Sequence, residues 1–65
     1  MQIRVNGKEL EVAATTLAAL LEELEYQGVV VATALNQNFV RAVDRCETLL
    51  EAGDAVEILT PKQGG

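Results

Sequence analysis

The chain has 65 residues, of which 49% are apolar, and its ten acidic and five basic residues give a formal net charge of −5. A chain of this length forms one domain with a thin core, which excludes a catalytic domain beside a separate binding domain. Phosphate backbones repel an acidic surface, so nucleic-acid binding is disfavoured. The sequence contains no apolar run of about 18 residues, so we expect no interaction with a membrane.

The histidine and cysteine content limits which catalytic and metal-binding sites the chain can form. The sequence has no histidine, the usual general base and metal ligand at neutral pH, and its single cysteine, Cys46, cannot form an internal disulfide. The start of the sequence lacks the pattern of a signal peptide, so we expect a cytoplasmic protein. We expect Cys46 to pack as a small apolar residue. The alternative is a sulfur-bearing nucleophile, which requires a basic neighbour or a helix N-terminus.

Two short strands are predicted at the start of the chain, over residues 2–5 and 8–12. They flank Asn6-Gly7, and this dipeptide is the strongest signal for a two-residue hairpin because both turn positions need a positive φ. Apolar residues alternate with polar residues in both segments. This alternation predicts that one face of the sheet is buried and the other is exposed to solvent.

A helix is predicted from Leu17, with Thr15 or Thr16 as its N-cap. Leucines repeat at the spacing of one helical face, at Leu17, Leu20, Leu21 and Leu24. Gly28 is expected to end the helix in a left-handed conformation. The glutamates near the helix end are expected to face solvent rather than to bind a metal; they are Glu22, Glu23 and Glu25.

A third strand is predicted over residues 29–35, because consecutive valines at its start favour a strand that is buried on much of both faces. Residues 36–38 are turn-like, and Phe39-Val40 is expected to return as a short strand. Residues 41–52 are ambiguous between a short helix and an irregular segment, and we expect a loop with one helical turn. The apolar residues expected to pack this loop on the core are Val43, Cys46, Leu49 and Leu50.

The last strand is predicted over residues 55–60, after a turn at 51–54. Val56 and Ile58 lie on one face of this strand, and Glu57 and Leu59 lie on the other. Pro61 stops the strand because proline has no backbone N–H. No apolar residue follows it, so we expect residues 61–65 to form a flexible, extended C-terminal tail.

The predicted order of two strands, one helix and three strands indicates the α+β class rather than a doubly wound fold. One leucine-striped helix across one face of a mixed sheet of four to five strands buries both apolar surfaces. If the first and last strands are parallel neighbours, this arrangement is a β-grasp. We therefore expect a β-grasp domain over residues 1–60 and a tail over residues 61–65.

The tail ends in Gly64-Gly65, and no turn or helix cap accounts for these glycines. One interpretation is chance, since ordinary glycine usage produces a terminal Gly-Gly about once in two hundred chains. The other is that residues without side chains let the backbone enter a narrow channel of a partner, with the Gly65 carboxylate as the reactive group. A carboxylate must first be activated, for instance as an acyl-adenylate. The sequence has no phosphate-binding loop, so no cofactor is expected on this chain and a partner would supply ATP and Mg²⁺.

The sequence resembles the ubiquitin-like β-grasp sulfur carriers, and most closely the thiamine-pathway (ThiS-like) carriers, over its whole length. The segments that carry the resemblance are Ile3 to Gly7, Thr16-Leu17, Leu20-Leu21, Val31-Ala32, Leu35-Asn36, Leu50 to Asp54, Val56 to Ile58 and Gly64-Gly65. The family often has glycine where this chain has Gln37, and Pro-Arg where it has Arg41-Ala42. The resemblance implies a ubiquitin-like β-grasp fold.

The resemblance also implies that the chain is a protein cosubstrate rather than an enzyme. An E1-like adenylyltransferase (ThiF-like) would adenylate the Gly65 carboxylate, and a persulfide from a cysteine desulfurase would convert it to a thiocarboxylate. A thiazole synthase (ThiG-like) would then take the sulfur to build the thiazole of thiamine. Gly64, Gln63 and Lys62 would give the tail access to these enzymes.

Phe39 and Leu59 are the candidate residues of a partner-docking patch. Strand alternation places Leu59 opposite Val56 and Ile58, and Phe39 is expected to join it across the sheet. Apolar residues on a solvent-exposed sheet face mark a surface for a partner, and the alternative for both residues is core packing. The net charge of −5 predicts basic residues on the docking face of the activating enzyme.

Other functions stay open from the sequence. The same carboxylate chemistry could deliver sulfur to molybdopterin, cysteine or thiolated tRNA. Alternatively, the chain is a β-grasp interaction module in which the glycines have no chemical role, or a ubiquitin-like modifier that joins Gly65 to a lysine of a target protein.

Overall fold

The computed structural model describes residues 1–61, and its elements follow the predicted order. They are β1 (Gln2–Val5), β2 (Lys8–Glu11), α1 (Leu17–Glu23), β3 (Ala32–Leu35), β4 (Asn38–Val40), the 3₁₀ helix η1 (Ala42–Glu47) and β5 (Ala55–Leu59). None of the helices within residues 1–61 has the length and apolar content that a membrane crossing requires.

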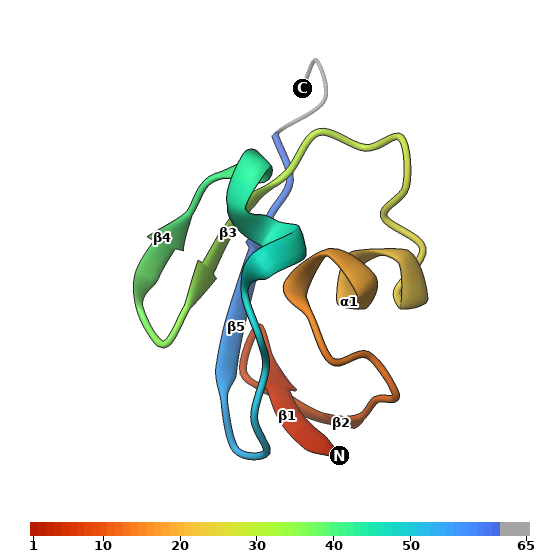
Figure 1. Cartoon of the computed structure of the whole chain (residues 1–65), viewed down its shortest axis with the longest axis vertical. Coiled ribbons are helices and arrows are strands. Elements are labelled where there is room, and N and C mark those ends of the chain that lie inside the picture. Colours follow the sequence, from red (N-terminus) through yellow and green to blue (C-terminus); the bar gives the residue numbers. More distant parts are fainter. Residues whose placement is uncertain (62–65) are drawn as a thin grey trace.

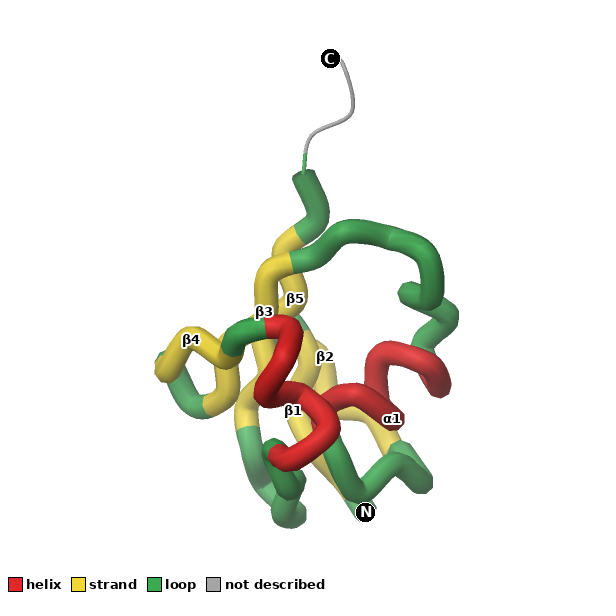
Figure 2. The backbone as a smooth tube through the Cα atoms, turned by 45° about the horizontal axis from the view of Figure 1, so that its top comes forward, coloured by secondary structure: helices red, strands yellow, loops and turns green. Residues whose placement is uncertain are grey.

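The last strand, β5, lies at the centre of a mixed sheet (Figure 1). The described residues form five strands in the order β2-β1-β5-β3-β4, in which β1 and β5 are parallel and the other neighbours are antiparallel. The helices α1 and η1 lie beside each other on one face of the sheet (Figure 2). The parallel pairing of the first and last strands confirms the predicted ubiquitin-like β-grasp fold.

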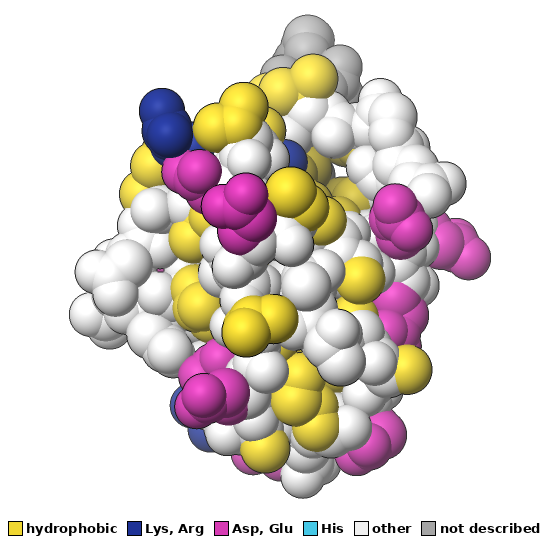
Figure 3. Space-filling view, viewed as in Figure 1, with side chains coloured by type: hydrophobic (Ala, Val, Ile, Leu, Met, Phe, Trp, Pro, Cys, Tyr) yellow, Lys and Arg dark blue, Asp and Glu magenta, His cyan; other side chains and the backbone are white. Residues whose placement is uncertain are grey.

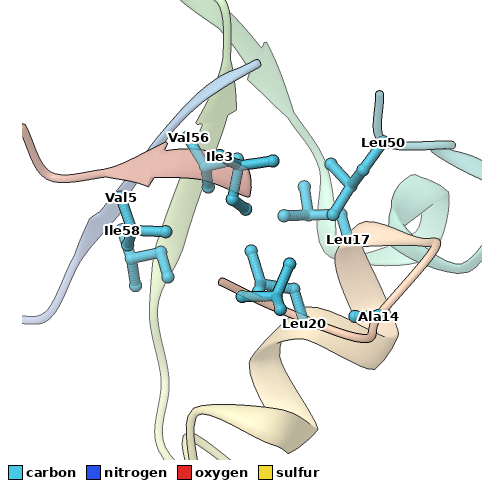
Figure 4. Close-up of a cluster of buried hydrophobic side chains, with 9 residues drawn as sticks. Ile3, Val5, Ala14, Leu17, Leu20, Leu50, Val56 and Ile58 are labelled. Atoms are coloured by element: carbon cyan, nitrogen blue, oxygen red, sulfur yellow. The ribbon is translucent and has the colours of Figure 1, made fainter. Parts of the chain in front are cut away.

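The core lies between α1 and the central strands. Leu17 and Leu20 of α1 are fully buried and point toward Ile3 of β1 and Val56 of β5 (Figure 4). The other buried apolar residues are Val5, Val12, Ala14, Leu50 and Ile58. Each buried leucine contributes roughly 1.5–3 kcal/mol relative to an exposed one. This packing therefore holds α1 against β1 and β5.

Both predicted turns adopt a left-handed backbone. Asn6 and Gly7 have φ angles of 51° and 83° and join β1 to β2, which confirms the predicted hairpin. Asn36 and Gln37 have φ angles of 50° and 72° and join β3 to β4, which confirms the predicted return strand. Gln37 thus carries a side chain at a position where glycine is favoured, because an L-residue crowds its own backbone there.

The start of α1 is as predicted and its end is not. The Thr16 hydroxyl caps the helix by accepting a hydrogen bond of 3.1 Å from the amide of Ala19. The helix ends at Glu23 rather than near Gly28, and Glu25 is the left-handed residue after it, with φ 67°. The Tyr26 amide reaches back to the Leu21 carbonyl over 2.8 Å, which closes the last turn in a Schellman motif. Gly28 has a positive φ in the following loop.

The prediction that a third strand begins at the valines is wrong. β3 begins at Ala32, and Val29 and Val30 are 48% and 79% exposed in the loop that precedes it. The physical reason lies in the partner strand. Ala32 pairs with Leu59, the last residue of β5, so the valines before Ala32 have no residue of β5 to pair with among those described. Consecutive β-branched residues do not form a strand unless a neighbouring strand pairs with their backbone.

The segment 41–52 contains the predicted helical turn, as η1, but its predicted packing is largely wrong. Val43 and Leu49 are 71% and 70% exposed, and Cys46 is also exposed; Leu50 alone of the four is buried. For Leu49 and Leu50 the reason lies in the backbone. An isolated bridge pairs Leu49 with Thr16, with main-chain hydrogen bonds from residue 17 to Thr48 and from Leu50 to residue 15. In such an extended segment successive side chains point to opposite sides.

Glu23 differs from the prediction that it only faces solvent. One carboxylate oxygen accepts hydrogen bonds of 2.9 Å from the Ala14 amide and 3.1 Å from the Ala13 amide. This carboxylate therefore ties the end of α1 to the loop that precedes the helix, and so fixes how β2 leads into α1. Glu22 and Glu25 are exposed as predicted, and no group of acidic, cysteine or histidine side chains within residues 1–61 is placed to hold a metal ion.

Candidate functional site

The predicted sulfur-bearing residue and its access residues lie outside the described residues. They are Gly65, Gly64, Gln63 and Lys62. The structure does describe where the chain leaves the sheet, at Leu59, Thr60 and Pro61. This exit lies at one end of the central strand β5, beside the start of β3 (Figure 2). The candidate site is therefore the surface around the end of β5.

Leu59 and Phe39 lie on the sheet face opposite the core. Leu59 is 72% exposed and Phe39 is 69% exposed, so neither packs in the core. Val56 and Ile58 alternate with Leu59 along β5 and are buried on the other face, as the sequence predicts. The two exposed residues are not direct neighbours, because β3 runs between their strands: Leu59 pairs with Ala32, and Phe39 pairs with Ala34.

The small side chains of β3 make this face hollow. A shallow groove is lined by Ala32, Ala34, Phe39, Glu57 and Leu59 together with Thr33. A second hollow continues past Leu59 to the chain exit, and its lining includes Val30 and Pro61. We call the apolar members of the two hollows the apolar patch: Val30, Val31, Ala32, Ala34, Phe39, Leu59 and Pro61. The alanines were not among the predicted site residues, although their alternation with Thr33 is typical of a strand with a shallow face between larger neighbours.

On the core-facing side of β3, opposite the apolar patch, a network of hydrogen bonds joins β3, β4 and η1. Thr33 is 1% exposed, and its hydroxyl donates a 2.9 Å hydrogen bond to the Val40 carbonyl. Arg45 of η1 donates from Nε to the Thr33 hydroxyl over 3.0 Å and from Nη2 to the Val31 carbonyl over 2.7 Å. These bonds satisfy buried polar groups and join η1 to β3 and β4. The strands that carry the patch are therefore held together by a side chain from the opposite face.

Arg41, which follows β4, is paired with an acidic residue of η1. Arg41 Nε donates to Asp44 Oδ2 over 3.0 Å. This hydrogen bond and the charge of Asp44 raise the pKa of Arg41. Seen from the α1 side, acidic side chains are spread over much of the surface and basic ones are few (Figure 3). The net charge of −5 favours a partner with positive charge around its docking face.

Cys46 is exposed on η1, so its predicted role as a small packing residue is wrong. The reason is the exposed outer side of η1, where Val43 is also left uncovered. The exposed position of Cys46 does not test the alternative prediction, a sulfur-bearing cysteine.

The chain matches known proteins over its full length. The model of the ThiS family matches residues 3–65. A crystal structure of a thiamine biosynthesis protein (ThiS) from Geobacter metallireducens is 32% identical, with a TM-score of 0.83 and 100% of both chains covered. A solution structure of a thiamine biosynthesis protein from the same organism is 32% identical with a TM-score of 0.81, over 100% of this chain and 88% of that one. The comparison with curated proteins finds no significant match.

The TM-score of 0.83 over the whole of both chains shows that this chain shares its fold with that ThiS structure. The matches confirm the resemblance that the sequence motifs indicate. The chain belongs to the ThiS family of ubiquitin-like sulfur carriers.

Proposed function

We propose that this chain carries sulfur for the thiazole of thiamine as a thiocarboxylate on Gly65. The observation that carries the proposal is the family match, whose span of residues 3–65 includes both terminal glycines. The chain is then a protein cosubstrate of the cytoplasm, and the chemistry takes place in its partner enzymes. The proposal requires Gly65 to be the last residue of the protein, because only a terminal carboxylate can be activated in this way.

The proposed reaction begins with an E1-like adenylyltransferase that binds ATP and Mg²⁺. The Gly65 carboxylate attacks the α-phosphorus of ATP, which forms the acyl-adenylate and releases pyrophosphate. The terminal sulfur of a persulfide, supplied through a cysteine desulfurase, then attacks the acyl carbon and displaces AMP. A thiol cleaves the resulting S–S bond and releases the thiocarboxylate, which delivers its sulfur to a thiazole synthase. As the C–S bond breaks and the sulfur passes to the acceptor, an oxygen atom from water takes its place and restores the Gly65 carboxylate for another cycle.

The apolar patch is proposed as the docking surface for the adenylyltransferase, with Phe39 and Leu59 as its largest side chains. Its position supports this role, because the patch extends from β4 to Pro61 at the chain exit. Lys62 to Gly65 follow, and an extended chain spans at most about 3.3–3.6 Å per residue. The Gly65 carboxylate can therefore reach roughly 14 Å beyond Pro61. A partner that docks on the patch must hold its ATP within that distance.

Lys62, Gln63 and Gly64 are proposed to carry the carboxylate through the channel of the partner. Glycine at position 64 leaves no side chain next to the reacting carbonyl and allows backbone angles that other residues do not adopt. The activating enzyme, the thiazole synthase and the persulfide donor all have to accept this same segment.

The test is the intact mass of the chain after incubation with ATP, Mg²⁺, an E1-like enzyme and a sulfur source. We expect the mass increase of one oxygen replaced by sulfur, with fragmentation placing the change on Gly65. Deletion of Gly65 should abolish the increase, whereas Cys46→Ser should load normally because the exposed Cys46 takes no part. An unchanged mass, with an enzyme that loads another carrier in parallel, would contradict the proposal. Delivery of the sulfur to an acceptor other than thiazole synthase would keep the carrier and change its pathway.

A further inference from the structure

The hydrogen-bond ladder between β1 and β5 ends before β5 does. The Arg4 amide donates to the Asp54 carbonyl and the Asn6 amide donates to the Val56 carbonyl, each over 2.9 Å. The ladder advances by two residues at each step, so a continued parallel pairing would next join Ile58 to the main chain of Asn6. Asn6 instead turns into the hairpin, with φ 51°. The backbone groups of Ile58 on this side are therefore left without a strand residue opposite them.

The side chain of Asn6 takes the place of the missing strand residue. Its Oδ1 accepts from the Ile58 amide over 2.8 Å, and its Nδ2 donates to the Ile58 carbonyl over 3.1 Å. A carboxamide presents one acceptor and a donor side by side, as a peptide group does, so it can satisfy both backbone groups of one residue. Ile58 is 5% exposed, and a backbone group left without a hydrogen-bond partner at a buried residue destabilises the fold.

This bond pair is placed at the end of β5 from which the reactive tail departs. Ile58 is followed by Leu59, Thr60 and Pro61, and β3 holds the other side of the strand through the pairs Thr33 with Ile58 and Ala32 with Leu59. Asn6 therefore holds the last residues of β5 from the β1 side. Without it, the final residues of the strand would be held from one side.

We propose that Asn6 is a positioning residue for activation of Gly65: its carboxamide holds the end of β5 so that the chain leaves the sheet at a constant point and direction. This inference rests on the proposed sulfur-carrier function. The partner docks on the patch and must find the carboxylate at a distance set by the chain between them. A fixed exit raises the fraction of docked molecules whose carboxylate reaches the ATP, which increases kcat rather than the affinity of docking.

The second hairpin provides a matched control. Asn36 has nearly the same conformation as Asn6, with φ 50°, and its Oδ1 accepts from the Ala55 amide over 2.9 Å. Its Nδ2 donates to Asp54 Oδ1 over 3.1 Å. Asn36 thus binds β5 through its side-chain carboxamide, as Asn6 does, but at the beginning of the strand, far from the chain exit. Glycine suits both positive φ angles, so Asn6→Gly and Asn36→Gly remove the side-chain bonds without straining either turn.

The experiment compares these variants under conditions in which both are folded. Amide hydrogen exchange of the chain alone should accelerate at Ile58 in Asn6→Gly and at Ala55 in Asn36→Gly. With the E1-like enzyme, ATP-dependent release of pyrophosphate should show a kcat about tenfold lower for Asn6→Gly, with KM for the carrier changed by less than about twofold. Asn36→Gly should keep both constants within about twofold. Asn6→Asp retains the acceptor for the Ile58 amide and removes the donor, so its kcat should fall less than that of Asn6→Gly.

Equal kcat values for wild type and Asn6→Gly would overturn the positioning role, and so would equal losses in the two glycine variants. If Asn6→Gly does not fold, the same comparison is made with Asn6→Ala and Asn36→Ala, which also remove the carboxamide at each position. A wild-type chain that releases no pyrophosphate with any E1-like enzyme of its host would overturn the proposed function and the positioning role together. Normal turnover of wild type with an unimpaired Asn6 variant would overturn the positioning role alone.

Discussion

The two faces of β5 carry similar side chains with different surroundings. Ile58 is 5% exposed within the core, whereas its neighbour Leu59 is 72% exposed on the apolar patch. Removal of either side chain from water releases a similar free energy, so the difference lies in what covers each face. The chain covers the Ile58 face with α1. We propose that a partner covers the Leu59 face, and then the same kind of residue stabilises the fold on one face and provides recognition on the other.

The largest effect is expected from a change on the covered face. Leu20→Ala should reduce the free energy of unfolding by about 2–5 kcal/mol, because it leaves a cavity between α1 and the sheet. Chemical denaturation followed by circular dichroism measures this loss. Leu21→Ala is the matched control, since Leu21 is only half-buried beside the core and should lose less. Equal losses in the two variants would show that α1 does not cover the sheet as described.

On the open face, Leu59→Asp should weaken binding to the activating enzyme at least about tenfold, because it places a charge at the centre of the proposed docking patch. Its free energy of unfolding should stay within about 0.5 kcal/mol of wild type, as expected for an exposed position. Titration calorimetry and denaturation measure the two quantities. Val43→Asp is a control of similar exposure, 71%, on η1, and should bind normally. An unchanged affinity of Leu59→Asp would remove Leu59 from the docking surface.

An exposed residue on the α1 side should also affect stability, through hydrogen bonds rather than apolar burial. Glu23→Ala should reduce the free energy of unfolding by about 1 kcal/mol, because it removes the acceptor for the Ala13 and Ala14 amides. Glu22→Ala is the control, since Glu22 is an exposed neighbour on the same helix. If both variants unfold at the same denaturant concentration, the Glu23 contacts contribute nothing to stability.

The smallest effect is expected at the turn between β3 and β4, which borders the patch. Gln37→Gly should raise the free energy of unfolding by roughly 0.5–1 kcal/mol, because glycine tolerates the φ of 72°. Gly7→Gln in the other hairpin should lower it by a similar amount; a Cβ there meets nothing within 4 Å, so backbone strain alone acts. Thermal denaturation measures both. Changes of the same sign would show that the two turns differ in more than this residue. Neither variant should alter binding through Leu59.

Local patterns predicted much of the fold. Asn6-Gly7 indicated a hairpin because its backbone needs φ angles that few residues adopt, and Thr16 marked the start of α1 by its hydroxyl. Strand alternation assigned the opposite faces of Val56 and Leu59 correctly. Each of these features depends on a few consecutive residues, so their chemistry is readable without the rest of the chain.

The end of α1 and the packing of η1 were not predictable in the same way. Glu25 occupies the left-handed position at the helix end that was predicted for Gly28, because hydrogen bonds back to residues 21 and 22 end the helix earlier. Leu49 and Leu50 are neighbours of one residue type, and only a bridge to residues 15–17 decides that Leu50 is the buried one.

By itself, the sequence determined the order of the elements, the two turns and the family, because these follow from short motifs and from their spacing along the chain. Tertiary structure decided where β3 begins, which carboxylate binds the loop before α1, and how the alanines of β3 bring Phe39 and Leu59 to one hollow face. It also decided that Asn6 bonds to Ile58, 52 residues away. These features depend on which distant segments become neighbours in the sheet. The chemistry of a polar or apolar side chain shows that it needs a partner, but only the folded sheet determines which residue that partner is.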